Sequence, residues 1–195
     1  LENTIPHEYR DAVREGILAW NEAFEAAGFK NAIVAKQMPD DADWDPADVR
    51  YNTVRWMFQP GSGYAVGPSR ANPYTGELYD ADIRISSDFV RGFYRGFTDY
   101  VVPLIGPVAM DFEMDEPWEE FSSEMCLYGD YLRDEMASAW DIMTAAGILK
   151  GTDKDLNNYI HNGIVDLILH EIGHTLGLRH NFKASSVFTY EELSN

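Results

Sequence analysis

The residues best suited to chemistry lie near the C-terminal end, where the chain reads HEIGHTLGLRH from His170 to His180. His170 and His174 are four positions apart, so on one helix both imidazoles project from the same face. Glu171 lies one step around the helix and can reach a water on a metal ion without ligating that ion. Gly177 lets the chain leave the helix through a conformation that a side chain would disfavour. This turn can bring His180 back as a third nitrogen ligand.

Three neutral imidazoles with one open coordination position are typical of a catalytic zinc site. Structural zinc sites normally fill all four positions, usually with thiolates, and this chain has one cysteine, Cys126. The pattern therefore predicts one catalytic Zn²⁺ ion. His7 and His161 lie outside the motif and are expected to be surface or otherwise satisfied histidines. His161 is placed on a different face of the helix from His170.

Composition limits the classes of partner. The 195 residues include 33 Asp+Glu against 15 Lys+Arg, so the net charge of −18 disfavours nucleic acid and anionic membranes as partners. No apolar run approaches the ~20 residues that a membrane span needs.

The acidic segment from Asp40 to Asp48 gathers carboxylates of the kind that bind Ca²⁺. Its spacing fits no calcium-loop pattern, so a calcium ion there is unsupported and a solvated loop is expected.

The first half of the chain predicts one helix followed by strands. Residues 6–27 form an amphipathic helical pattern, which Asn3 or Thr4 could cap and Gly28 could end. Pro68 follows a short apolar run and belongs on a sheet edge, because proline cannot donate to a ladder. Asn-Pro-Tyr-Thr-Gly at 72–76 is typical of a turn. The expected strands lie at residues 31–38, 51–59, 64–66 and 77–86.

The second half predicts helices. Residues 89–97 form a short aromatic-rich helix, 101–118 are irregular, and 122–146 form a long helix or a broken pair. The last helix, at about 153–176, is capped by Thr152 or Asp153 and has an apolar stripe. That stripe consists of Leu156, Ile160, Ile164, Leu167 and Ile168. The element order indicates an α+β fold, a twisted mixed β-sheet with packed helices.

HEIGHTLGLRH resembles the extended zinc motif of the metzincins. The longer stretch HEIGHTLGLRHNFKAS is similar to a bacterial group of large secreted zinc-dependent metalloproteases. The upstream run YAVGPSRANPYTGELYDADI and the opening helix, IPHEYRDAVREGILAWNEAFEAAGF, also resemble that group. The resemblance implies a zincin-like fold, a peptide or protein substrate, and a secreted, periplasmic or cell-surface location.

Carried over by position, the resemblance implies that His170, His174 and His180 are zinc ligands and that Glu171 is the general base. Gly177 would be the turn glycine. Metzincins also align substrate along an upstream edge strand that lies over the active-site helix. The matching segment here is Tyr64, Ala65, Val66 and Gly67, with Pro68 after it.

Metzincins place a methionine turn beneath the zinc, downstream of the third histidine, whereas no methionine follows Met143 here. The expectation is therefore an excised catalytic piece. Residues 1–177 would form the N-terminal catalytic subdomain, and 178–195 would begin a truncated C-terminal subdomain. Such a piece would lack the methionine turn and the lower wall of the cleft, on which activity depends.

The leading functional prediction is a zinc-dependent endopeptidase in which zinc-activated water attacks the peptide bond. Two alternatives use the same residues. One is a zinc-loaded binding module without turnover, against which the intact Glu171 argues. The other is a zinc hydrolase that acts on non-peptide substrates.

Overall fold

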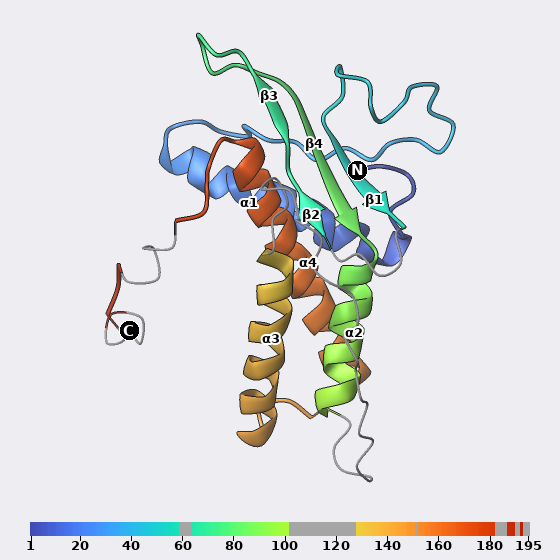
Figure 1. Cartoon of the computed structure of the whole chain (residues 1–195), viewed down its shortest axis with the longest axis vertical. Coiled ribbons are helices and arrows are strands. Elements are labelled where there is room, and N and C mark those ends of the chain that lie inside the picture. Colours follow the sequence, from blue (N-terminus) through green and yellow to red (C-terminus); the bar gives the residue numbers. More distant parts are fainter. Residues whose placement is uncertain (59–63, 102–127, 151, 182–186, 190–191, 193–195) are drawn as a thin grey trace, which may run out of the picture.

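The computed structural model describes residues 1–58, 64–101, 128–150, 152–181, 187–189 and 192. A small sheet with helices packed against it forms the structure (Figure 1). This confirms the predicted α+β class. The elements are η1 (His7–Tyr9), α1 (Arg10–Ala26), β1 (Thr53–Met57), β2 (Ala65–Val66), β3 (Ser69–Ala71), β4 (Leu78–Ser86), α2 (Asp88–Val101), α3 (Tyr128–Ala145) and α4 (Asp153–Thr175).

The sheet is built around β4. β1 pairs parallel with β4 on one side, while β2 and β3 pair antiparallel with it on the other. Ile83 and Ile85 of β4 point into the core, at 4% and 2% exposure. The turn at 72–76 closes the β3–β4 hairpin, where Asn72 accepts from the Gly76 N–H and donates to the Glu77 carbonyl. In the described part of the chain no strand pairs with the outer side of β2 and β3, so they form an edge.

Helix α4 places the apolar stripe along its buried face, and hydrogen bonds from nearby residues cap its N-terminus. Thr152 accepts from the Asp155 N–H, and Asp155 accepts from the Thr152 N–H, which is a capping box. All five residues of the predicted stripe are buried. α4 begins at the predicted residue and ends one residue earlier than predicted. It packs against α1, α2, α3, β2 and β4 and so lies at the centre of the fold.

Helix α1 approaches α4 closely because Gly16 lacks a side chain. A Cβ at Gly16 would lie 2.7 Å from both the Ile168 Cβ and the Val165 carbonyl oxygen. Further along α1, the Trp20 indole N–H donates to the Leu169 carbonyl at 2.8 Å. These contacts hold α1 against the half of α4 that carries the histidine motif.

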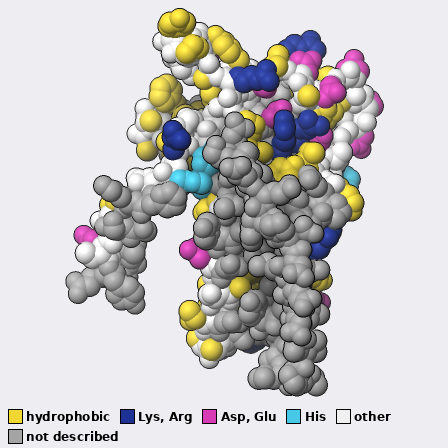
Figure 2. Space-filling view, in the orientation of Figure 1, with side chains coloured by type: hydrophobic (Ala, Val, Ile, Leu, Met, Phe, Trp, Pro, Cys, Tyr) yellow, Lys and Arg dark blue, Asp and Glu magenta, His cyan; other side chains and the backbone are white. Residues whose placement is uncertain are grey.

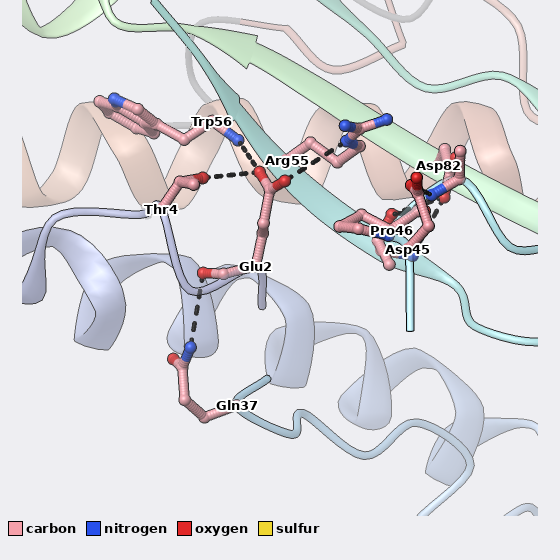
Figure 3. A network of polar contacts seen from close by, with 10 residues as sticks. Glu2, Thr4, Gln37, Asp45, Pro46, Arg55, Trp56 and Asp82 are labelled. Atoms are coloured by element: carbon pink, nitrogen blue, oxygen red, sulfur yellow. Dashed lines mark hydrogen bonds and ion pairs between the residues drawn. The ribbon is translucent and has the colours of Figure 1, made fainter. Parts of the chain in front are cut away.

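The N-terminus is fastened to β1 by Glu2 (Figure 3). Its carboxylate is almost buried and accepts from the Trp56 N–H at 3.0 Å and the Thr4 hydroxyl at 2.7 Å. Arg55 lies 3.6 Å from the other carboxylate oxygen. The Glu2 N–H also donates to the Val54 carbonyl at 3.0 Å. The first residues therefore cover the side of β1 that faces away from β4.

Two local predictions are wrong. The segment at 31–38 is not a strand, because side chains of α1 take up its backbone groups instead of a neighbouring strand. Asn21 bonds both the N–H and the carbonyl of Ile33, and Arg14 donates to the Ala35 carbonyl. The predicted caps Asn3 and Thr4 make no cap hydrogen bond, since a turn of 3₁₀ helix after Pro6 starts this region.

Other elements match in kind but differ in extent. The strands predicted at 51–59, 64–66 and 77–86 are present as β1, β2 and β4, whereas β3 was not predicted. α2 extends beyond the predicted 89–97. Residues 102–127, with Cys126 and most of the predicted irregular segment, lie outside the described residues.

None of the described helices combines the length and apolarity of a membrane span.

Candidate metal centre

The three motif histidines come together at the end of α4. Their ligating nitrogens all lie within 4.8 Å of one another, a spacing that could hold a metal ion. His170 and His174 project from the last turns of α4, and His180 returns from the chain beyond it. His170 and His174 are partly exposed and His180 is exposed, so the cluster can be reached by an ion from solvent. Figure 2 shows histidine side chains, in cyan, at the molecular surface.

The return of His180 depends on how α4 ends. Gly177 has φ of +91°, which favours glycine. The Gly177 N–H donates to the His174 carbonyl at 2.9 Å and the Leu178 N–H to the Gly173 carbonyl at 3.0 Å. This pair of bonds is a Schellman motif, which satisfies the last helical carbonyls while the chain reverses.

The geometry and chemistry of the cluster fit zinc. Nitrogens bound to one tetrahedral zinc at its usual bond length lie roughly 3.3 Å apart. The Nε2 atoms of His170 and His180 are 3.1 Å apart. At His174, Nδ1 lies 2.9 Å from the Leu178 carbonyl, so Nδ1 carries the proton and Nε2 presents its lone pair. Neutral imidazoles of this kind are standard zinc ligands.

The electrostatics of the cluster favour the neutral forms of His170 and His180. Burial, with smaller contributions from the neighbouring His174 and His180, lowers the pKa of His170 to about 4. Burial and His174 also lower the pKa of His180. A protonated imidazole has no lone pair for a metal, so these shifts favour the state that can ligate at neutral pH.

Glu171 lies beneath the edge strand. The residue is fully buried, and Gly67, which follows β2, sits directly against it. A Cβ at Gly67 would overlap the Glu171 carbonyl oxygen and lie 3.3 Å from Oε2. The structure thus brings together Glu171 and the segment Tyr64 to Gly67, which were expected to share one site. Ala65 is buried, whereas Tyr64 and Val66 are partly exposed.

One residue beside the cluster was not predicted. Tyr128, at the start of α3, lies flat on the His170 ring, with centroids 3.7 Å apart and planes 3° from parallel. Its hydroxyl donates to the Asp166 carboxylate of α4. Asp166 stands four residues before His170 and is therefore on the same helix face, a signal that could have drawn attention to it. Nothing local in the sequence links Tyr128 to this face.

The other candidate ligands stay apart from the cluster. His161 contacts Glu15 of α1 at 2.8 Å, as expected for a histidine on another face of α4. Asp45 and Asp48 in the acidic loop accept from backbone N–H groups two residues further on. In the described part of the chain, only the group His170, His174 and His180 has the spacing of a metal site.

Comparison with known proteins agrees with this site. A family model described as Met-zincin matches residues 152–195, a span that includes α4 and all three histidines. Searches among curated proteins and among solved structures found no match. The family implies zinc, a metallopeptidase activity, and a peptide or protein substrate. Residues 152–195 are thus similar to Met-zincin sequence, and the histidine cluster has the spacing of a metal site, as expected for a metzincin-type zinc metallopeptidase.

Proposed function

We propose that this chain is the catalytic core of a zinc-dependent endopeptidase. In this proposal His170, His174 and His180 hold one Zn²⁺ and Glu171 is the general base. The observation that carries it is the convergence of the three ligating nitrogens within 4.8 Å, although His180 lies beyond the end of the helix. The Schellman turn at the end of α4 reverses the chain and so returns His180 to the other two histidines.

Zinc, when bound, lowers the pKa of a coordinated water toward ~7 and polarises the scissile carbonyl. The protein's own residues would supply the proton transfers. The Glu171 carboxylate takes a proton from the attacking water and delivers it to the leaving amine. Because Glu171 follows His170 directly in α4, the helix sets its place relative to the ligands. Burial under Gly67 restricts the conformations open to the carboxylate.

We further propose that substrate pairs with the edge formed by Tyr64, Ala65, Val66 and Gly67. The support is topological, since β2 bonds β4 on one side only within the described sheet. An extended peptide adding to that edge would obtain backbone hydrogen bonds. It would also pass beside Glu171, because Gly67 lies against that residue. The peptide bond would thereby be brought close to the general base.

The test compares the parent chain, Glu171→Ala and His161→Ala for zinc content and for cleavage of an unbiased peptide mixture. Glu171→Ala should keep about one equivalent of zinc and lose hydrolysis by ~10²–10⁴-fold. His161→Ala is the matched control, because it removes a polar side chain from α4 outside the cluster. Equal cleavage by the parent and Glu171→Ala would reject Glu171 as the base.

The same assays separate the alternatives. Zinc retention with no hydrolysis of peptides or small esters would indicate a binding module. Hydrolysis of small esters or amides without peptide cleavage would indicate a non-peptide hydrolase. Failure to retain zinc after add-back and dialysis would reject the metal site.

A further inference from the structure

The contact between Tyr128 and His170 joins two elements that are far apart in the sequence. Tyr128 opens α3, and His170 lies in the last turns of α4. Their rings are stacked almost parallel, at 3.7 Å and 3°. The Tyr128 ring covers one face of the imidazole, and the His174 ring lies perpendicular to it at 4.6 Å between centroids. The His170 ring is therefore confined by two aromatic neighbours.

The Tyr128 ring is itself fixed. Its hydroxyl donates to Asp166 Oδ2, and Asp166 is four residues before His170 on the same face of α4. The tyrosine thus contacts α4 at two points one helical turn apart, through its hydroxyl and through its ring. Two points of attachment prevent it from sliding along the helix or rotating away from His170.

The orientation of the imidazole matters because the χ2 torsion of histidine is intrinsically broad. An unrestrained ring would direct Nε2 over a wide arc and would lose that freedom on binding a metal. In the structure Nε2 of His170 already lies 3.1 Å from Nε2 of His180. Holding the ring in that direction before the ion arrives lowers the entropy lost on binding.

We propose that Tyr128, anchored by Asp166, is a positioning residue that orients the His170 imidazole for the metal. This inference rests on the proposed zinc site. It adds a contribution from α3 to a site whose motif lies entirely on α4 and the segment after it. Tyr128 makes its contact through the ring face, so it acts on the ligand and not on the ion.

The variants separate stacking from anchoring. Tyr128→Leu removes the stack, and Tyr128→Phe keeps the stack but loses the bond to Asp166. Asp166→Ala removes the anchor, whereas Asp166→Asn retains an acceptor oxygen for the tyrosine hydroxyl. Tyr159→Leu is the matched control, because Tyr159 is a buried aromatic residue of α4 that contacts Phe93 and Trp140. It tests the cost of losing aromatic packing without touching His170.

Two measurements decide the proposal: zinc affinity by chelator competition, and the visible absorption spectrum of the Co²⁺-substituted protein. Tyr128→Leu should weaken zinc binding by ~10- to 100-fold, the usual effect of losing a partner that orients a ligand. It should also change the Co²⁺ bands. Tyr128→Phe and Asp166→Ala should show smaller losses, and Asp166→Asn should recover most of the parent affinity. Tyr159→Leu should lower stability and leave the Co²⁺ spectrum unchanged.

The outcomes distinguish this inference from the proposed function. If the parent binds zinc and the Tyr128 and Asp166 variants match it in affinity and spectrum, the positioning role is wrong and the zinc site stands. If the parent binds no zinc, the zinc site and the inference fall together. Should Tyr128→Leu fail to fold, Tyr128→Phe and the two Asp166 variants still decide, since they change polar groups only.

Discussion

Gly67 of the edge strand lies directly against Glu171 of α4, with no room between them for a side chain. A Cβ at Gly67 would overlap the Glu171 carbonyl oxygen and lie 3.1 Å from the carbonyl carbon. The approach involves the helix backbone, which cannot move aside as a flexible side chain could. The distance between edge strand and helix at the site is therefore set by the absence of a side chain at this position.

Gly67→Ala should separate the strand from the helix and destabilise the protein by about 1–3 kcal/mol, the usual cost of overpacking. Denaturant unfolding measures this cost, and peptide hydrolysis should fall with it because the edge shifts relative to Glu171. The matched control is Gly76→Ala, where φ is +75° and no atom lies within 4 Å of the added methyl group. That variant should lose stability through backbone strain alone and keep its activity relative to folded protein. Equal loss of activity per folded molecule in both variants would contradict the steric explanation.

Removal of zinc should lower the free energy of unfolding. A ligand that binds only the native state stabilises it by ~2.7 kcal/mol at a free concentration one hundred times its Kd. Thermal unfolding with zinc and with excess chelator should therefore differ in the parent. The difference should disappear in His180→Ala, which removes the ligand beyond the helix, and persist in His161→Ala. A full zinc-dependent shift in His180→Ala would show that His180 is not a ligand.

The zinc-free protein should become less stable as the pH falls below the ordinary range of histidine. Burial holds the pKa of His170 at about 4 in the folded state, against a usual value of 6.5. Between these values the unfolded chain binds the proton more readily, so protonation favours unfolding. The stability associated with neutral His170 is fully present above about pH 6.5 and is lost as the pH falls toward about 4.

This pH dependence is checked by denaturant unfolding in the presence of chelator across that range. His170→Gln cannot be protonated, so its stability should fall less steeply over the same interval. Identical slopes for the parent and His170→Gln would contradict the assignment to His170.

Loss of the α4 cap should weaken the fold without altering the metal site. Thr152→Ala removes the hydroxyl that accepts from the Asp155 N–H, which should cost about 1 kcal/mol. Thr152→Ser keeps an equivalent hydroxyl and should stay close to the parent. The cap and the histidines stand at opposite ends of a helix of 23 residues, so zinc affinity should not change. Unfolding measurements and chelator competition check the two expectations separately.

The sequence was most informative where a structural feature depends on interactions within a single helix, strand or turn. In α4, the five apolar positions and the turn glycine act within or next to the helix and were predicted, and the cap, Thr152, was one of the two residues proposed for it. β4 and the turn before it are also local, because an alternating apolar pattern and an Asn-Pro-Tyr-Thr-Gly turn need no distant partner to be identified. The convergence of the three histidines follows from the same local rules.

The sequence-based predictions failed where residues distant in the sequence determine the local conformation or contact. Residues 31–38 have strand-like composition, yet Arg14 and Asn21 bond their backbone and hold them along α1. Periodicity cannot reveal such a partner. Tyr128 stands 38 positions from Asp166, and no spacing rule joins them. β3 is short and entirely exposed, so it has no apolar pattern to mark it.

The division of the ligands between two kinds of segment bears on how quickly a metal ion would exchange. His170 and His174 keep their spacing through the hydrogen bonds of α4, with or without an ion. Leu178, Arg179 and His180 are all exposed, and this short stretch alone carries the third nitrogen. An incoming ion can dock on the helical pair first and be closed in afterwards. If the ion binds as proposed, its escape would require only a few residues to move outward while the helix stays intact, and the opening rate of that stretch would govern the lifetime of the bound ion.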